Sequence, residues 1–282
     1  MYTTNFELKL YLTTKWDKLK RFLVHMIKTL TKRVWIAFSE KLGTSIFHPQ
    51  SLLIRFQREA IQEAKKYAKG KLIDIGCGRM PYKKELEPLV SSYTGVDHPE
   101  VSKLYRSNVK PDVLADAKKL PFRSNSFDIA LLIQVLEHVD SPDKVIKEAA
   151  RVLKPGGVLI LSVPFFYPLH DMPYDWGRYT STALKSFLDE ASFQVIKIKL
   201  QGGFFEFWLQ MLNTFLLKRI YDIILSGIKF DSLILLIFIV LVSAPILLFN
   251  SLLIVIINSI ASLFPKYPNY FPLDYLVVAK KK

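Results

Sequence analysis

Short segments rich in valine, isoleucine and leucine alternate with helical segments along the middle of this chain, and this order limits the fold more than any other feature. The expected strands are 71–75, 93–97, 113–115, 127–133, 158–163 and 193–200. The expected helices are 51–68, 81–89, 142–153 and 181–191, and Lys154–Gly157 is expected to be a turn. Apolar residues occupy both faces of the strands, as in a parallel sheet covered by helices. The sequence therefore predicts an α/β fold.

The first strand runs into a glycine turn. Gly76, Cys77 and Gly78 follow it, and glycine lets a backbone approach a nucleotide where a Cβ atom would collide. Pro81 stands where a nicotinamide-binding turn has a third glycine, and no Gly-Lys-Ser/Thr phosphate loop is present. The turn therefore predicts a nucleotide-like ligand, but it disfavours a nicotinamide dinucleotide and a nucleotide bound through a phosphate loop.

Two aspartates end the next two strands. Asp97 ends the second strand, where a carboxylate can accept hydrogen bonds from two ribose hydroxyls. Asp116 ends the third, where it can accept a hydrogen bond from an adenine amino group while Ala117 offers its backbone N–H. Taken singly, either aspartate is equally well explained as a helix cap or turn residue.

Several blocks in this order resemble the class I S-adenosylmethionine-dependent methyltransferases, in particular a type 11-like branch with a Gly-Cys-Gly-x-x-Pro-Tyr motif. The blocks are Gly76–Tyr82, Leu120–Phe122, Ser126–Asp128, Val135–Val139 and Arg151–Gly157, and the resemblance covers residues 55–200 and 272–280. It implies a Rossmann-like sheet of seven strands with flanking helices and an antiparallel last strand. It also implies S-adenosylmethionine as cofactor. The methionine part would lie over Asp74, Gly76 and Gly78, the ribose on Asp97, the adenine against Asp116 and Ala117, and Gln134 at the inner edge.

Histidines follow two of the strands at the edge where ligands bind in open α/β sheets. A sulfonium methyl group is already activated, so such an enzyme mainly aligns the acceptor and excludes water, although a hydroxyl acceptor would benefit from a base. His170, followed by Asp171, is the better candidate base. His138 lies in a block that the family retains across substrates, which favours a structural or cofactor-side role.

The block that begins at His170 and Asp171 resembles a sub-branch with the pattern His-Glu-x-Pro-x-Asp-Tyr/Trp-x-Arg-Tyr/Phe-Thr. Its members are often placed in surface polysaccharide or glycolipid pathways. Asp171 stands where glutamate is commoner. Arg178 can pair with Asp175 or bind an acidic group such as a phosphate, and Thr180 or the next residue can cap the following helix.

The positive charge is concentrated at the N-terminal end. The formal net charge is +14, and most of the excess of lysine and arginine lies in residues 1–70. Residues 1–48 mix apolar and basic residues at roughly helical spacing, which predicts a basic amphipathic arm. Such an arm favours an anionic membrane surface or nucleic acid as partner, although its apolar side could instead pack on the catalytic domain.

Residues 1–20 lack the apolar core and cleavage site of a secretory signal, so we expect the N-terminus to remain on the mature protein. The single cysteine, Cys77, excludes a disulfide framework and a cysteine-based metal site. A reducing compartment fits this composition, and the sequence assigns no metal ion.

An uncharged apolar stretch, Ser232–Pro265, interrupts the domain before its apparent last strand, 273–280. As one straight helix it would be roughly 50 Å long, against a hydrocarbon core of about 30 Å. Pro245 predicts a break and Asn250–Ser251 a turn. We therefore expect two shorter helices that enter the bilayer and return to the same side, with 204–230 along the interface. A tilted single span and burial against a second copy are the alternatives.

These features predict three parts: the arm 1–48, a methyltransferase domain 49–200 and 272–282, and a hydrophobic membrane-associated helical insertion 201–271. We expect a membrane-associated enzyme with its catalytic domain on the cytoplasmic side. Its acceptor would be a membrane-resident or lipid-linked molecule, such as a glycolipid, polysaccharide or polyisoprenoid intermediate, methylated on oxygen. Neither the acceptor's identity nor the oligomeric state is written in the sequence.

Two other functions stay open. A nucleic-acid methyltransferase that uses the basic arm is disfavoured, because no Asn/Asp-Pro-Pro-Tyr/Phe block and no Pro-Cys nucleophile is present. A non-catalytic membrane adaptor that retains the fold is disfavoured by the intact set of cofactor residues.

Overall fold

The computed structural model describes residues 50–102, 110–225, 230–261 and 270–282, together with Phe22 and Met26. The chain divides into two compact units. One contains residues 52–208 and 264–282, and the described part of the other consists mainly of 209–225 and 230–261. The predicted basic arm, 1–48, lies outside the described residues except for Phe22 and Met26.

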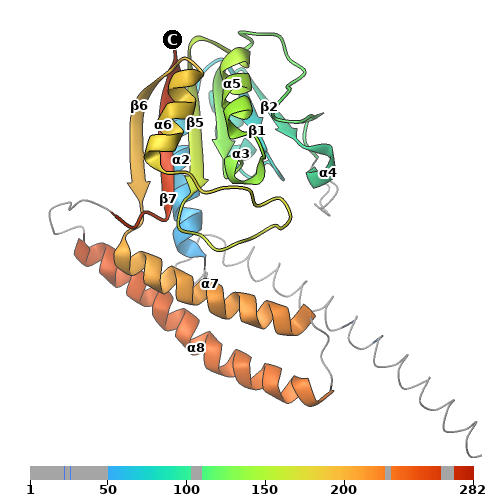
Figure 1. Cartoon of the computed structure of the whole chain (residues 1–282), viewed down its shortest axis with the longest axis vertical. Helices are drawn as coiled ribbons and strands as arrows, with labels where there is room; N and C mark the ends of the chain where they lie inside the picture. Colours follow the sequence, from blue (N-terminus) through green and yellow to red (C-terminus); the bar gives the residue numbers. More distant parts are fainter. Residues whose placement is uncertain (1–21, 23–25, 27–49, 103–109, 226–229, 262–269) are drawn as a thin grey trace, which may run out of the picture. The chain divides into compact units, whose positions relative to one another are not determined.

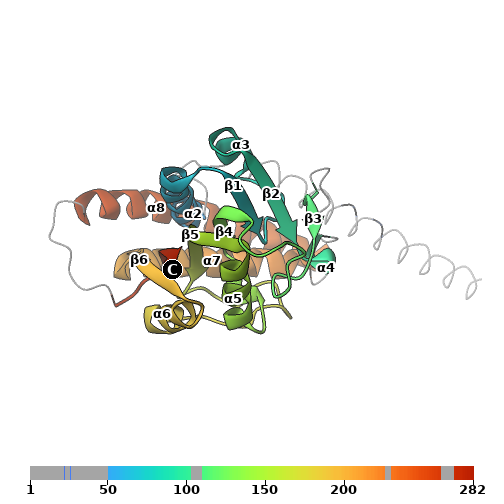
Figure 2. The same ribbon diagram turned by 90° about the horizontal axis from the view of Figure 1, so that it is seen from above.

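A mixed sheet forms the centre of the first unit. Its strands are β1 (Lys71–Ile75), β2 (Ser92–Asp97), β3 (Val113–Leu114), β4 (Phe127–Ile133), β5 (Leu153–Pro164), β6 (Phe193–Gln201) and β7 (Asp274–Lys281). They are ordered β3-β2-β1-β4-β5-β7-β6 (Figures 1 and 2). The pairs among β1 to β5 are parallel, and β7 runs antiparallel to both β5 and β6. The expected seven-stranded sheet with an antiparallel last strand is confirmed.

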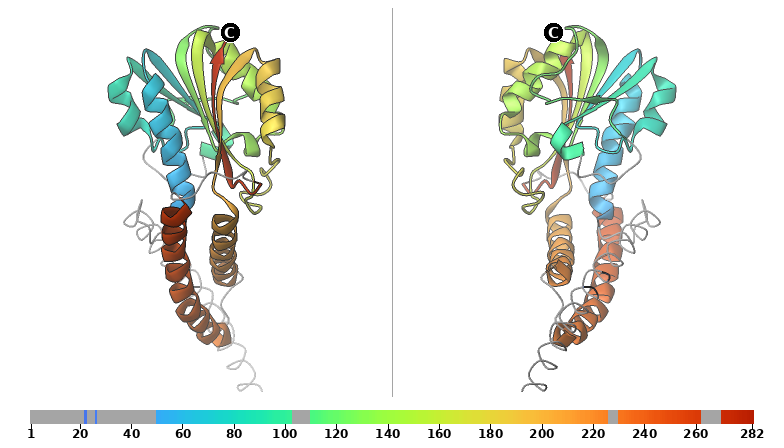
Figure 3. Two further views of the ribbon diagram at one scale, coloured as in Figure 1. Left: turned by 90° about the vertical axis from the view of Figure 1, so that its left-hand side faces the viewer. Right: turned by 90° about the vertical axis from the view of Figure 1, so that its right-hand side faces the viewer.

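Helices cover both faces of this sheet (Figure 3). The helices of this unit are α2 (Ser51–Tyr67), α3 (Lys83–Leu86), η1 (Glu87–Leu89), α4 (Pro99–Ser102), η2 (Leu136–His138), α5 (Pro142–Val152) and α6 (Ser181–Glu190). Buried residues of α5 and α6 pack with Ile73 and Ile75 of β1 on one face. Buried residues of α2 and α3 pack with Leu72 on the other. Because successive side chains of a strand point to opposite faces, one apolar run supplies both cores.

β5 is longer than its sequence predicts. It begins at Leu153, directly after α5, rather than at Val158, so Lys154–Gly157 is part of the strand and not a turn. Leu153 pairs with Phe127, and an irregularity in register follows. A Cβ atom on Gly157 would lie 2.9 Å from the carbonyl oxygen of Lys154. The absence of a side chain at Gly157 therefore lets the backbone of Lys154 lie close to it within the strand. The prediction of a turn at these residues does not anticipate this contact.

The hydrophobic segment forms two long helices, α7 (Phe204–Leu225) and α8 (Phe230–Ala261). The prediction that Pro245 breaks the helix and that Asn250–Ser251 forms a turn is wrong, because α8 continues through all three residues. A proline removes one hydrogen bond but bends a helix without ending it when neighbours hold it, and α8 is curved (Figure 3). The buried side chain of Asn250 donates to Oδ1 of Asn213 at 3.0 Å, which joins α8 to α7.

The helical hairpin is thus made by α7 and α8, which lie side by side (Figures 1 and 3). Within the described part of the chain, no helix meets the combined length and hydropathy that a membrane crossing requires.

Candidate functional site

The turn after β1 places backbone groups at the carboxyl edge of the sheet. Gly76 and Gly78 have φ values of +74° and +53°, a region that favours glycine. The N–H groups of Gly76 and Cys77 donate to the carbonyl of Val96 at 2.8 and 3.0 Å, which ties the turn to β2. A Cβ atom on Gly76 would lie 2.4 Å from Cγ2 of Val135. The turn therefore needs glycine at this position for both conformation and space.

Asp97 lies against this turn. Its Oδ2 accepts from the N–H of Gly78 at 3.0 Å, and its Oδ1 accepts from the N–H of His98 at 2.7 Å. Burial raises the pKa of Asp97, although these two hydrogen bonds oppose the shift. The structure thus brings together the predicted ribose ligand and the predicted glycine turn, and each carboxylate oxygen keeps a lone pair for a further donor.

Asp74 lies beneath the same turn, at the end of β1. It is buried and accepts a short hydrogen bond from the hydroxyl of Tyr93. Burial raises the pKa of Asp74 to about 7 against the effect of that hydrogen bond, and the charge of Asp97 raises it further. At neutral pH this carboxyl is therefore poised between its two forms.

Asp116 and Ala117 follow β3, whose last residue is Leu114. Oδ1 of Asp116 accepts from the N–H of Lys118 at 2.8 Å, and its Oδ2 lies 3.7 Å from Nζ of the same lysine. Ala117 is partly buried and packs against the core. Asp116 thus has the geometry of a turn residue, with a side chain that stays 42% exposed and open to a ligand.

Gln134 links three strands. Its backbone has a φ of +57°, and its Nε2 donates to Oγ of Ser162 at 2.9 Å and to Oδ2 of Asp274 at 2.7 Å. Ser162 donates to Oδ1 of Asp274 at 2.9 Å. Burial raises the pKa of Asp274 to about 7, although the hydrogen bonds from Gln134 and Ser162 lower it. Sequence reasoning missed Asp274, whose one signal is that it is the first residue of an otherwise apolar closing strand.

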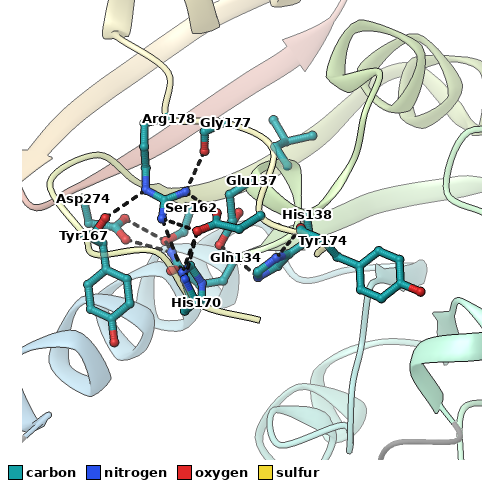
Figure 4. A network of polar contacts seen from close by, with 12 residues as sticks. Gln134, Glu137, His138, Ser162, Tyr167, His170, Tyr174, Gly177, Arg178 and Asp274 are labelled. Carbon is teal, nitrogen blue, oxygen red and sulfur yellow. Dashed lines mark hydrogen bonds and ion pairs between the residues drawn. The ribbon is translucent and has the colours of Figure 1, made fainter. Parts of the chain in front are cut away.

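A second polar cluster lies beyond Gln134 (Figure 4). The rings of His138 and His170 meet edge to face with centroids 4.9 Å apart. Glu137 is fully buried, and its Oε1 lies 3.8 Å from Nε2 of His138. Burial raises the pKa of Glu137 to about 8, and burial together with His138 lowers that of His170. The two predicted histidines are therefore brought together, with a buried glutamate beside them that sequence reasoning did not assign.

Asp175, rather than Asp171, is the carboxylate against His170. Its Oδ2 accepts from the backbone N–H of His170 at 2.9 Å and lies 3.5 Å from Nδ1 of the ring. Arg178 donates to both oxygens of Asp175, at 2.6 and 3.0 Å. Burial favours the neutral acid, but the hydrogen bonds from Arg178 lower the pKa of Asp175 to about 2. Arg178 could either pair with Asp175 or bind an acidic group, and in the structure it pairs with Asp175.

Asp171 is exposed and has a φ of +51°. Its backbone carbonyl accepts from the N–H of Tyr174 at 3.1 Å, so it occupies a tight turn. Thr180 caps α6, because its hydroxyl accepts from the N–H of Ala183 at 3.2 Å. The loop from β5 to α6 is thus held at both ends while Asp171 faces outward.

Aromatic side chains surround the same edge of the sheet. Phe166 follows β5 and contacts Phe207 and Phe271, with ring centroids 5.1 and 6.1 Å apart. Exposed apolar residues continue this surface on the neighbouring segments. They are Leu169, Met172, Tyr174, Trp176, Phe204, Phe205, Trp208, Tyr270 and Phe271, which together we name the aromatic rim.

The donor set at this edge fits S-adenosylmethionine. Buried carboxyls with raised pKa values, namely Asp74, Asp97, Asp274 and Glu137, gather along it. A cationic ligand stabilises the ionised form of such groups. The sulfonium and ammonium charges of this cofactor supply that cation, and the glycine turn leaves its backbone accessible. Asp74, Asp97 and the glycine turn are thus suited to hold it.

Comparisons with known proteins agree with this geometry. Residues 73–161 match the family model described as a methyltransferase domain. An uncharacterized protein of Methanocaldococcus jannaschii is 30% identical over 42% of this chain and 55% of its own length. The Caenorhabditis elegans protein named sterol 4-C-methyltransferase is 35% identical over 32% of this chain and 29% of its own length.

A Xanthomonas oryzae protein named ubiquinone biosynthesis O-methyltransferase is 33% identical over 34% of this chain and 43% of its own length. This chain thus spans about half or less of the length of these relatives. A solved structure titled as a possible histamine N-methyltransferase from Thermotoga maritima aligns at 17% identity with a TM-score of 0.48, over 88% of this chain and 97% of that chain.

Proposed function

We propose that this chain, in which residues 73–161 form a class I S-adenosylmethionine-dependent methyltransferase domain, methylates an oxygen atom of a membrane-resident or lipid-linked acceptor. The observation that carries the proposal is the position of the aromatic rim. β5, β6 and β7 all place the adjoining rim segments at the edge where the cofactor residues lie. Exposed apolar surface of this kind marks a binding site for an apolar partner. An acceptor that approaches this edge therefore meets apolar side chains before it meets the polar cluster.

The names of two relatives support the same class of acceptor. One is named for ubiquinone biosynthesis and the other for a sterol, both of which are lipids. The acceptor class rests on the rim together with these names.

The exposed apolar side chains of α7 and α8 support a membrane location as part of this proposal. Both helices expose large apolar side chains, among them Phe215, Leu241, Leu248, Phe249 and Leu252. Leaving such groups in water costs free energy in proportion to their area, and a lipid surface removes that cost. Because S-adenosylmethionine is a cytoplasmic metabolite, we place the methyltransferase domain on the cytoplasmic side of the membrane.

The residues of the site divide the work of methyl transfer. When bound, S-adenosylmethionine supplies a methyl group on a positively charged sulfur. Asp97 accepts hydrogen bonds from the ribose, Asp74 offsets the positive charge, and the glycine turn lets the backbone approach. His170, held neutral by its lowered pKa, can accept the proton of an acceptor hydroxyl. The aromatic rim excludes water around the acceptor.

Methylation of lipid by the purified full-length chain tests the proposal. With methyl-labelled S-adenosylmethionine and a total membrane lipid extract, we expect label in the lipid fraction. Asp97→Ala should weaken cofactor binding roughly 100-fold, since two hydrogen bonds to a charged group are lost. Asp143→Ala removes an exposed carboxylate from α5 and is the matched control. Unchanged calorimetric affinity in Asp97→Ala would refute the ribose assignment, and label that enters only nucleic acid would refute the acceptor class.

Substitutions in the aromatic rim test how the acceptor is reached. Trp176→Ser with Phe205→Ser should lower methylation of lipid severalfold and leave cofactor affinity unchanged, because both side chains are exposed at the acceptor edge. Leu89→Ser removes an exposed apolar side chain from η1, outside the aromatic rim, and should have no effect. Equal rates for the rim variant and the control would count against an apolar acceptor surface.

A further inference from the structure

Glu137, His138 and His170 form a cluster with the composition of a metal site. One ligand atom from each residue lies within 4.8 Å of the others. Glu137 and His138 come from η2, after β4, and His170 from the loop after β5, so parallel strands bring them to one edge (Figure 4). Asp74, Asp97 and the glycine turn, which are suited to hold the cofactor, do not include these three groups, although Asp175 and Arg178 contact the ring of His170.

The carboxyl group of Glu137 is the independent sign of a missing ligand. Its side chain is 0% exposed, and neither Oε1 nor Oε2 has a hydrogen-bond partner in another of the described residues. A buried polar group without a partner costs free energy. The nearest imidazole nitrogen, Nε2 of His138, is 3.8 Å from Oε1, too far for a hydrogen bond. The separation between Oε1 of Glu137 and Nε2 of His138 is therefore compatible with a third atom that both could bind.

The orientation of both rings presents Nε2 as the free nitrogen. Nδ1 of His138 lies 3.0 Å from the carbonyl oxygen of Tyr174, and Nδ1 of His170 lies 3.2 Å from that of Pro168. A carbonyl can only accept, so these contacts place the proton on Nδ1 in each ring. Arg178 lies 3.3 Å from Nδ1 of His170 but also donates to Pro168 and Asp175. Histidines that bind metals characteristically donate their other N–H to a carbonyl or carboxylate in this way.

We propose that Glu137, His138 and His170 bind one divalent transition-metal ion of the zinc type. Two neutral imidazoles and one carboxylate suit zinc, cobalt or ferrous iron, whereas magnesium and calcium prefer oxygen ligands. Zinc bonds of about 2.1 Å in a tetrahedron set ligand atoms about 3.4 Å apart, so ligand atoms that lie within 4.8 Å of one another have to approach by about 1.4 Å or less. Both imidazoles are 27% exposed, which gives the ion a path to the buried carboxylate.

Three protein ligands leave a coordination position for an oxygen atom, as in catalytic zinc sites. An acceptor hydroxyl at that position would lose its proton to solvent more readily, because a bound divalent ion lowers its pKa. His170 would then act as a ligand and not as a base. This role in catalysis rests on the proposed function, whereas binding of the ion does not.

Metal titration of the full-length chain tests the site directly. After treatment with a chelator, the protein should bind one equivalent of Zn²⁺ by calorimetry, and one equivalent of Co²⁺ should give a visible absorption band of low-coordinate cobalt. His138→Ala and His170→Ala should each weaken Zn²⁺ binding by more than about tenfold, because the loss of even an outer-shell partner of a metal ligand costs about 10- to 100-fold. His98→Gln removes a histidine beside Asp97 and should leave Zn²⁺ affinity unchanged. Mg²⁺ should not compete.

Glu137→Gln should also weaken Zn²⁺ binding, and the two histidine variants keep the test decisive if this variant does not fold. Retained binding of S-adenosylhomocysteine confirms that each variant is intact. The proposal would be overturned if the unaltered chain did not bind Zn²⁺ at about 1 mM metal. It would also be overturned if both histidine variants bound Zn²⁺ with the affinity of the unaltered chain. Because no methyl transfer is measured, a failure to methylate lipid leaves this result unaffected.

Discussion

Asp274 offers a measurable consequence of burying a carboxyl at the closing strand. The ordinary pKa of an aspartate is near 4, and burial raises that of Asp274 to about 7. Between these values the folded chain keeps a proton that the unfolded chain has lost, so this group's stabilisation is complete below pH 4 and disappears as the pH rises through 7. The free energy involved is about 4 kcal/mol, at about 1.4 kcal/mol for each unit of pKa.

Asp274→Asn removes this titration while keeping the shape of the side chain. The asparagine carbonyl can still accept from Oγ of Ser162, and the amide of Gln134 can turn to present its oxygen to the new N–H group. As the pH rises from 4 to 7, the unfolding free energy of the variant should therefore increase by about 4 kcal/mol relative to that of the unaltered chain. At a few degrees for each kcal/mol, the difference between the two melting temperatures should change by roughly 10 °C.

Thermal melting followed by circular dichroism, without cofactor and at half-unit pH steps, measures this difference. The other buried carboxyls titrate in both proteins and cancel in the comparison. Asp189→Asn on α6, whose side chain is 48% exposed, is the matched control and should follow the unaltered chain at every pH. Parallel melting curves for Asp274→Asn and the unaltered chain from pH 4 to 8 would refute the reasoning.

Two further substitutions test the glycine turn and the loop after β5. Gly76→Ala should lower the unfolding free energy by at least about 1 kcal/mol, because a left-handed backbone disfavours alanine and the new Cβ atom would meet Val135. In urea denaturation, adding Val135→Ala should restore only part of this loss. Full restoration would show that the backbone at this position is not strained. Asp175→Asn should cost about 2 kcal/mol at pH 7. The pKa of Asp175 is lowered to about 2, so this stabilisation is present above pH 4 and is lost as the pH falls through 2; a difference that persists unchanged at pH 2 would contradict the Arg178 pairing as its cause.

The core of the fold is readable from local sequence. The apolar run before Gly76 predicts β1 because both faces of that strand are buried. The glycine turn and Asp97 are also local signals, since each depends on a strand end and on a residue type that the backbone or the ligand requires. The count of strands and the antiparallel closing strand came from family resemblance, which summarises tertiary structure already seen elsewhere.

The tertiary structure alone decided which polar groups meet. Asp274 reaches Gln134 and Ser162 only because β7 is inserted between β5 and β6. The choice of Asp175 over Asp171 as the partner of His170 depends on a turn that directs Asp171 outward.

The same limit explains the error at Pro245. Proline and the Asn250–Ser251 pair have strong local preferences for breaks and turns, but packing against α7 and the bond between Asn250 and Asn213 outweigh them. Likewise, no spacing in the sequence marks Glu137, His138 and His170 as one cluster, because His170 is supplied by a different loop. Local preference is set by neighbours along the chain, whereas a buried polar contact is set by neighbours in space, and only the folded chain provides those.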